Sequence, residues 1–299
     1  MVLICDVSFW MYFTDMIRTV GLAIAFSPTA ERMLSEAIFI ARLLDARLVL
    51  IHVGDHGQKE EQLLQHLLGN RGISREEVTV RWQQGAAAKE ILKACEAEKV
   101  DLLVAGALKK EEMIQYYLGS VARDIMRKAK CSVLLLTQPA LVPAGFKNIV
   151  VDAEDSPSVR QAISFACLLG KKSKDAWVHV VRELKLYGLA MSASDHYSEK
   201  EYENIRQGLV KDEIEKVETL LQTIPHENLK LNIKVLSGKS GFELAQFAQR
   251  KQADLLVVSA PPRRFGFFDR VFTHDLEYVF ADLPCNLLIV QSGKERSRG

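Results

Sequence analysis

An internal repeat constrains this chain more than any other feature of its sequence. The block DLLVAGA begins at Asp101, and the similar block DLLVVSA begins at Asp254, 153 residues later. The block CSVLLLTQ begins at Cys131 and is matched by CNLLIVQS at Cys285, 154 residues later. Because these blocks recur in the same order, we interpret the chain as two copies of one folding unit.

The spacing between the copies is shorter near their beginnings. The Ser-Pro pair at 27–28 recurs at 156–157, an offset of 129 residues, and the His-Val pair at 52–53 recurs at 179–180, an offset of 127. The offset therefore rises by about 26 residues inside the second copy. This rise predicts an insertion after the second strand of that copy, within residues 181–222.

Each copy alternates short apolar runs of strand length with segments of helical periodicity. The apolar runs are apolar throughout, which is typical of parallel strands covered by helices on both faces. We therefore predict an α/β fold with two doubly wound, parallel, five-stranded sheets of the Rossmann-like class, one per repeat, with ligands bound beyond the carboxyl ends of the strands. The predicted strands are 21–26, 46–54, 78–85, 101–107 and 131–136 in copy 1, and 148–152, 176–181, 231–236, 254–259 and 286–290 in copy 2.

The domain boundaries follow from the repeat and from its flanks. The apolar stretch before Met16 is interrupted by Asp6 and lacks the features of a secretory signal, so we interpret it as an appendage. The segment PALVPAG between the copies holds two prolines and a glycine, which disfavour regular structure. The predicted organisation is an N-terminal appendage at 1–18, domain 1 at 19–138, a linker at 139–146, domain 2 at 147–292 and a tail at 293–299.

The composition excludes several classes of protein. Of the 299 residues, 48% are hydrophobic and 26% are charged, and the formal net charge is +1. Balanced charge argues against nucleic-acid binding, and no run approaches about 18 consecutive apolar residues, which argues against a membrane span. Five cysteines without a C-x-x-C pair favour a reduced, cytoplasmic protein.

The turn after the fourth strand of copy 1 has the residues of an anion site. Gly106 ends the strand, and its lack of a Cβ permits close approach of a ligand to the backbone. Gly119 and Ser120 open the next helix, where backbone N–H groups and a hydroxyl suit a phosphate. The same spacing also fits a strand-end glycine followed by an ordinary Gly-Ser helix cap.

These blocks resemble a known family. Ser-Pro after the first strand, LIHV in the second, DLLVAG in the fourth and the late Gly-Ser helix followed by CSVLLL are similar to the universal stress protein family, over nearly everything after Thr19. The resemblance is to its tandem form, with two such domains in one chain. It implies the adenine nucleotide alpha hydrolase-like fold, and as ligand ATP or another adenine nucleotide, with magnesium where a nucleotide is bound.

The resemblance also implies site residues in domain 1. The ATP-binding members carry Gly, two residues, Gly, nine residues and then Gly-Ser or Gly-Thr. Copy 1 departs from this pattern at the middle glycine, where Lys109 stands. The implied nucleotide-binding residues of domain 1 are Val53, which matches the position facing adenine, together with Gly106, Lys109, Gly119 and Ser120.

Copy 2 keeps the complementary part of the pattern. ATP-binding members place an acid at the end of strand one, where copy 1 reads Ala25 or Phe26 and copy 2 has Asp152. The glycines are lost in copy 2, since Ser259 replaces Gly106. Weak or absent ATP binding is therefore expected in domain 2. Its implied, degenerate site comprises Asp152, Val180, Arg263 and Thr273.

Other chemistry has little support in the sequence. His52, Asp55 and His56 form H-x-x-D-H at the end of the second strand, but no further ligand is identifiable, so we expect no metal site. The motifs G-x-G-x-x-G, G-x-x-x-x-G-K-[ST] and G-x-S-x-G are absent, which argues against dinucleotide dehydrogenases, P-loop NTPases and α/β-hydrolases.

We therefore expect a cytoplasmic stress-response or regulatory binding module rather than an efficient enzyme. One alternative is a slow ATP hydrolase that uses Glu111 and Glu112. Another is a ligand-free scaffold whose exposed Phe265, Phe267 and Phe268 bind a protein partner. We expect the fifth strands of the two copies to pair with each other, because an open edge would otherwise remain, and we expect two chains to self-associate as a homodimer.

Overall fold

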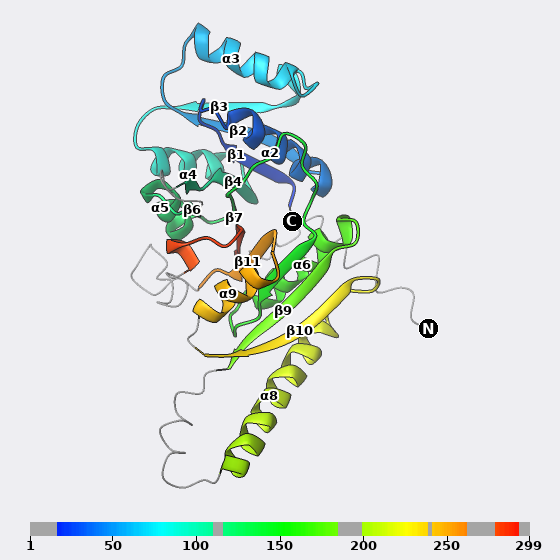
Figure 1. Cartoon of the computed structure of the whole chain (residues 1–299). Helices are drawn as coiled ribbons and strands as arrows, with labels where there is room; N and C mark the ends of the chain where they lie inside the picture. The colour runs from blue at the N-terminus through cyan, green and yellow to red at the C-terminus, as the bar shows by residue number, and fades with distance from the viewer. Residues whose placement is uncertain (1–16, 110–115, 185–198, 239–240, 262–278, 293–299) are drawn as a thin grey trace, which may run out of the picture.

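The computed structural model describes residues 17–109, 116–184, 199–238, 241–261 and 279–292 (Figure 1). The first half contains β1 (Thr19–Ala23), α2 (Ala30–Leu44), β2 (Arg47–Val53), α3 (Gln58–Gly69), β3 (Thr79–Gln83), α4 (Ala87–Ala97), β4 (Leu102–Gly106), β5 (Leu108–Lys109), β6 (Tyr116–Tyr117), α5 (Ser120–Lys128) and β7 (Ser132–Leu136). The second half contains β8 (Asn148–Asp152), α6 (Val159–Lys172), β9 (Trp177–Leu184), α8 (Glu199–Leu221), β10 (Lys230–Ser237), α9 (Phe242–Arg250), β11 (Leu255–Ser259) and β12 (Asn286–Val290).

Ten of these strands form one continuous sheet in the order β10-β9-β8-β11-β12-β7-β4-β1-β2-β3. Within each half the five strands are parallel, and the halves meet where β12 pairs antiparallel with β7. Figure 1 shows the first half, from blue to cyan, above the second half. The predicted doubly wound α/β fold and the predicted pairing of the fifth strands are therefore confirmed, and this pairing merges the two sheets into one.

The junction between the halves repeats one polar contact about an approximate twofold axis. Thr137 donates from its backbone N to Asn286 Oδ1 at 2.9 Å, and its Oγ1 lies 3.2 Å from the same atom. On the other side, Gln291 donates from its backbone N to Ser132 Oγ at 3.2 Å. Since the 154-residue offset relates Ser132 to Asn286 and Thr137 to Gln291, the two domains meet as the subunits of a dimer would.

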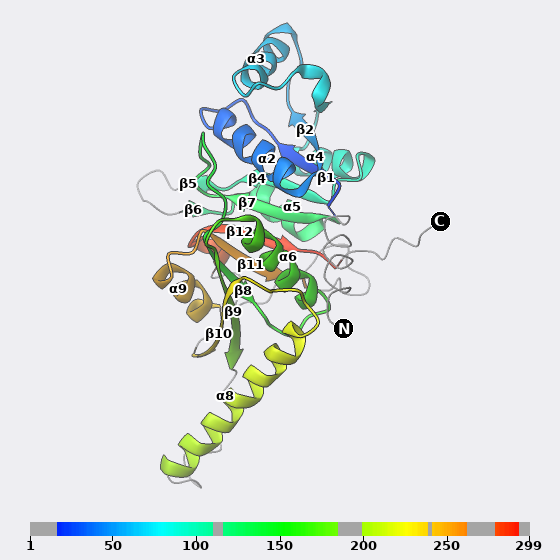
Figure 2. The ribbon, with the colours of Figure 1, turned by 90° about the vertical axis from the view of Figure 1, so that its right-hand side faces the viewer.

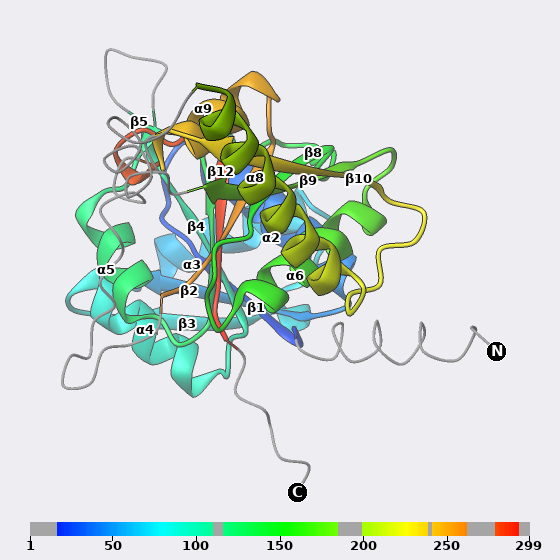
Figure 3. The same ribbon diagram turned by 90° about the horizontal axis from the view of Figure 1, so that it is seen from below.

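Helices cover both faces of the sheet. One core cluster contains the inward side chains of α2, α3, α6 and α8, and a second contains those of α4, α5 and α9. In Figure 3, α4 and α5 lie to the left of β4, and α2 and α6 lie to its right. Each cluster includes residues of both halves, so the two domains share their cores across the junction.

Equivalent aspartates anchor the first strand of each half. Asp101 Oδ2 accepts hydrogen bonds from the backbone amides of residues 18 and 19, at 3.0 and 3.1 Å. Asp254 Oδ2 accepts them from residues 147 and 148, at 2.7 and 2.9 Å. The aspartate that opens each DLLV block therefore fixes the start of the neighbouring strand. The first strand ends earlier than predicted, at Ala23 rather than Phe26, because the chain turns where Ser27 N bonds Ala25 O ahead of Pro28.

The insertion in the second half includes α8, which has 23 residues where α3 has 12. The C-terminal half of α8 buries Val217 and Leu221 in the core, while its N-terminal half projects from the body of the molecule (Figure 2). The first strands of the two halves are offset by 129 residues. In each half the first strand pairs with the second, with Thr19 opposite Arg47 in domain 1 and residue 148 opposite residue 177 in domain 2. This places the second strands at an offset of 130, not 127, so the insertion is about 23 residues rather than 26.

Among the described residues, no helix combines the length and the apolar character needed to cross a membrane.

Candidate functional site

The carboxyl end of β4 leads through the β5–β6 hairpin to the start of α5. Gly119 is the N-cap of α5 and is buried, and Ser120 is exposed at the first helical position. No side chain in the described part of the chain caps this helix, and no acid lies in its first turn. Because a helix N-terminus carries partial positive charge, this end of α5 is suited to an anion. Ligand binding there remains a prediction.

Both glycines of the predicted site lie against apolar side chains. A Cβ on Gly119 would lie 2.5 Å from Leu108 Cδ1, and a Cβ on Gly106 would lie 3.6 Å from Met33 Sδ. Leu108 is 51% exposed, so the tip of its side chain covers the turn from the solvent side. The backbone of Lys109 lies in β5 and pairs with Tyr116 of β6, while its side chain is outside the described part of the chain.

A group of small apolar side chains lies at the same edge of the sheet. Val53 ends β2 and Ala23 ends β1, and both are half-buried against the core cluster under α4 and α5. Ala88 of α4 and Ala107, just after β4, pack against the same cluster and are also half-buried. This surface suits a flat apolar ring, but Ala23 offers no hydrogen bond to a polar ligand.

The histidines of the H-x-x-D-H motif lie on the opposite face of the sheet from Val53. The ring of His52 lies 4.7 Å from that of Phe26, with its Nδ1 3.0 Å from the Ile24 carbonyl oxygen. His56 instead stacks on Trp82 with ring centroids 4.3 Å apart. In the described part of the chain, no three His, Cys, Asp or Glu residues are placed to hold a metal ion.

The strand registers identify the counterpart of Asp152 in domain 1. Residue 20 of β1 pairs with Leu102, and residue 149 of β8 pairs with Leu255. Because Leu102 and Leu255 each follow an anchoring aspartate, Asp152 corresponds to Ala23, and not to Ala25 or Phe26 as we predicted. The shorter first strand accounts for this difference.

Asp152 is a buried carboxylate among other acids. It is 7% exposed, and its Oδ1 accepts a hydrogen bond from Glu154 N at 3.1 Å. Burial raises the pKa of Asp152 to about 7, and the nearby charges of Glu154 and Glu183 contribute in the same direction. A buried carboxyl group at the end of a strand, whose surroundings disfavour its ionised form, is typical of a binding site.

Glu183 is a neighbour of Asp152 that the sequence analysis missed. The register that pairs Asp152 with Val181 places Glu183 where domain 1 has Val53, on the same face as Asp152. Its carboxylate accepts the backbone N–H of Gly241, the N-cap of α9, at 2.9 and 3.2 Å. Val180, which we predicted for this role, is fully buried in the core on the other face, so the structure does not bring it together with Asp152.

Arg182 is the structural counterpart of His52. Its Nη1 donates to the Ala153 carbonyl oxygen at 2.5 Å, as the ring of His52 contacts the Ile24 carbonyl. The guanidinium also pairs with both carboxylate oxygens of Asp155 and, through Nε, with Glu213 of α8 at 2.5 Å. The inserted helix is therefore anchored where domain 1 has an aromatic cluster. The strand register aligns Arg182 with His52 and Glu183 with Val53, whereas the repeated His-Val pair in the sequence gives a different alignment.

The remaining predicted residues of domain 2 are only partly described. Ser259 ends β11, and its buried hydroxyl has no hydrogen-bond partner among the described residues. Arg263, Thr273 and the aromatic residues Phe265, Phe267 and Phe268 lie outside the described residues, as do Glu111 and Glu112.

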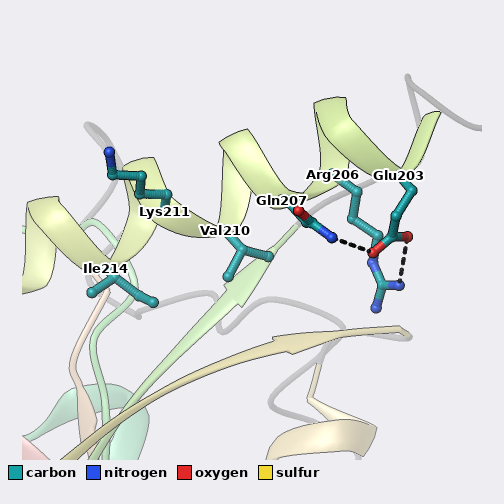
Figure 4. Close-up of a pocket in the computed structure, with 6 residues that line it drawn as sticks. All are labelled: Glu203, Arg206, Gln207, Val210, Lys211 and Ile214. Atoms are coloured by element: carbon teal, nitrogen blue, oxygen red, sulfur yellow. Dashed lines mark hydrogen bonds and ion pairs between the residues drawn. The ribbon is translucent and has the colours of Figure 1, made fainter. Parts of the chain in front are cut away.

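A separate open hollow of about 350 Å³ follows the N-terminal half of α8 (Figure 4). Val210 and Ile214 form its apolar part, and Glu203 accepts a hydrogen bond from Gln207 Nε2 at 3.1 Å across its rim. Its lining residues all come from α8, so it is not part of the site at the strand ends.

Comparisons with known proteins agree with this architecture. The universal stress protein family matches the chain twice, at residues 56–137 and 145–291. Universal stress protein MJ0531 of Methanocaldococcus jannaschii is 29% identical over 122 residues, covering 34% of this chain and 72% of that protein.

Several solved structures resemble nearly the whole chain. Protein PA1789 of Pseudomonas aeruginosa PAO1, described as functionally unknown, superposes with a TM-score of 0.69 at 18% identity, covering 93% of this chain and 94% of its own. A universal stress protein from Archaeoglobus fulgidus DSM 4304 gives a TM-score of 0.62 at 14% identity, covering 92% of this chain and 98% of its own. At these identities the similarity concerns the fold. Because the family matches most of the chain, once in each half, the chain belongs to the universal stress protein family and carries two of its domains.

Proposed function

We propose that this chain is a regulatory module of the stress response that binds an adenine nucleotide, or another phosphorylated ligand, in domain 1. It acts in the cytoplasm through two domains, 19–138 and 147–292, joined by the linker 139–146. The observation that carries the proposal is the N-terminus of α5 at Gly119 and Ser120, which no described side chain caps. This positive helix end lies at the carboxyl edge of the sheet, where ligands of doubly wound folds bind.

The residues of domain 1 fit part of an adenine nucleotide. The amides and the hydroxyl at the start of α5 suit phosphate oxygens, and the half-buried Val53 and Ala23 suit an apolar face of the base. Gly106 and Lys109 complete the set of residues that we propose for this site. No acid at Ala23 receives a ribose hydroxyl, so we expect lower affinity than in a domain with the complete set.

Domain 2 keeps an acid but in a different environment. Asp152 has the place of the ribose-binding carboxylate, whereas Glu183 replaces the apolar Val53. Additional negative charge next to Asp152 disfavours a nucleotide, whose phosphates are anionic. We therefore propose that domain 2 binds ATP weakly or not at all, with Arg263 and Thr273 as the residues that would contact phosphate.

The two alternatives from the sequence remain predictions, because their residues lie outside the described part of the chain. Slow hydrolysis of ATP would be detected as phosphate release with magnesium, lost on changing Glu111 and Glu112. A scaffold role would be detected as capture of a protein partner, lost on changing Phe267 and Phe268.

Ser120→Asp is expected to lower the affinity for ATP at least fivefold. The new carboxylate at the start of α5 would repel a phosphate by about 1–4 kcal/mol at 4 Å, depending on solvent screening. An acid in the first turn also favours the helix itself, so folding is not expected to suffer. Equilibrium binding of MgATP, measured by calorimetry on both proteins, gives the result directly.

Ser74→Asp is the matched control, because Ser74 is the exposed N-cap of a short 3₁₀ helix, Arg75–Glu77, elsewhere in domain 1. It is expected to leave ATP affinity within twofold. Gly119→Ala is a second test, since its Cβ would displace Leu108 from the turn. ATP affinity that is unchanged in both Ser120→Asp and Gly119→Ala would rule out this site, and mass spectrometry of small molecules released from the purified protein would identify the natural ligand.

A further inference from the structure

A segment of domain 2 is joined to the turn that carries the proposed anion site of domain 1. We call residues 279–283, which precede β12, the strap. Leu283 of the strap donates from its backbone N to the Tyr116 carbonyl oxygen at 3.0 Å, and these two residues form an antiparallel bridge. Leu118 N in turn lies 3.3 Å from the Phe280 carbonyl oxygen. The strap is therefore hydrogen-bonded to residues 116 and 118, and the second of these lies directly before Gly119. In Figures 1 and 2, β6 and the orange-red segment that contains the strap lie next to each other.

These hydrogen bonds are shielded from water. Leu118 is 2% exposed, Phe280 is 1% exposed and Leu283 is 4% exposed. All three belong to the core cluster that also contains Ala122 and Ile125 of α5. The first turn of α5 and the strap thus share one close-packed core cluster, so a displacement of the turn is expected to disturb the strap.

The residues that would contact the proposed ligand and the strap that positions them belong to different domains. The residues that would contact phosphate, Gly119 and Ser120, belong to domain 1, while two of the backbone groups that position the preceding residues belong to domain 2. A ligand that binds only when the turn is docked therefore stabilises the strap contact, and the docked strap favours binding to the same extent.

We infer that the strap couples the two domains, by holding the N-terminus of α5 in one position and by responding to whatever binds there. The inference rests on the proposed function for the nature of the ligand, but the positional coupling stands on the contacts alone. Domain 2 then has a role in ligand binding even though its own site is degenerate.

Hydrogen exchange of the Leu283 amide in the full chain tests the coupling without any ligand. Leu118→Ala removes buried contacts next to the strap, and it is expected to speed exchange at Leu283 at least tenfold. Leu64→Ala, at a residue 1% exposed in α3 of the same domain, removes an equally buried side chain away from the strap. It is expected to leave exchange at Leu283 within twofold of the wild type. Amides of β11 serve as the reference for global unfolding, and Leu118→Val replaces Leu118→Ala should the latter fail to fold.

Addition of MgATP to the wild-type protein separates the coupling from the proposed function. Slower exchange both at residues 120–122 and at Leu283 would support the two together. Protection of 120–122 with unchanged exchange at Leu283 would overturn the coupling and leave the nucleotide site in place. No protection by MgATP, with the expected effect of Leu118→Ala, would support the coupling and contradict the nucleotide assignment. Exchange at Leu283 that is the same in Leu118→Ala and Leu64→Ala would overturn the coupling whatever MgATP does.

Discussion

Asp152→Asn is expected to stabilise the protein at pH 8, by on the order of 4 kcal/mol relative to the wild type. The pKa of Asp152 is raised from 3.8 to about 7, chiefly by burial. The folded protein therefore holds a proton that the unfolded chain has lost between about pH 4 and pH 7, so stability falls as the pH rises through this range. Asparagine keeps an oxygen to accept the Glu154 amide and carries no charge, so it removes this dependence.

Denaturant unfolding of both proteins at pH 5 and pH 8 measures the effect. The difference between them should be about 1.6 kcal/mol at pH 5 and about 4 kcal/mol at pH 8. Asp212→Asn, at an exposed position of α8, is the control and should follow the wild type at both values. If the free energy of unfolding changed with pH in the same way in Asp152→Asn and in the wild type, folding would not raise the pKa of Asp152.

Arg182→Met is expected to lower the free energy of unfolding by about 3 kcal/mol and to loosen α8. The substitution keeps an apolar stem of similar length but leaves Glu213, with a side chain 15% exposed, without the guanidinium. Burial raises the pKa of Glu213, but hydrogen bonds from Lys216 and Arg182 outweigh that effect and hold it below its ordinary value. The Ala153 carbonyl oxygen also loses its charged donor.

Unfolding measurements and limited proteolysis within α8 check this second expectation. Arg206→Met is the matched control, because Arg206 lies on α8 with a side chain 43% exposed, a long ion pair to Glu203 at 3.7 Å and an exposed hydrogen bond to Ser237 Oγ at 3.4 Å. It should change stability by less than about 0.5 kcal/mol. Equal effects of the two substitutions would mean that Arg182 does not anchor the helix.

Different side chains contact the backbone just after the first strand in the two copies, His52 in domain 1 and Arg182 in domain 2. This difference explains where the inserted helix α8 is attached. Domain 1 places His52 in an aromatic cluster with Phe26 and Trp82. Domain 2 has Arg182 at that position, and an arginine that is 8% exposed needs acidic partners. Asp155 supplies one of them from the adjacent loop, and Glu213 supplies the other from α8.

Much of the fold was readable from the sequence because strands with helices on both faces have a distinctive composition. The predicted strands 148–152 and 286–290 have the bounds of β8 and β12, and the predicted helix at 199–221 has those of α8. Apolar runs of this length have few alternatives to a covered parallel strand. The same blocks predicted the pairing of the fifth strands, since an open apolar edge is unfavourable.

The site was predicted less completely, because its residues are defined by register. A repeated His-Val pair suggested that Val180 matches Val53, yet the hydrogen bonds from Ile24 N to Ile51 O and from Ala153 N to Val181 O set a different alignment. A shift of an odd number of residues moves a side chain to the other face of a strand. Val180 therefore lies in the core, and Glu183 lies at the strand end.

The sequence by itself determined that two related α/β units are joined in one chain and that only the second copy has an acid at the end of its first strand. It also predicted an anion site at the turn before α5. These conclusions depend on residue type and on spacing along the chain. The tertiary structure alone decided which side chains share a face, how Arg182 anchors α8, and that the strap of one domain bonds the turn of the other. Such contacts join residues up to 167 positions apart, as Tyr116 and Leu283 are, and no local pattern in the sequence encodes them.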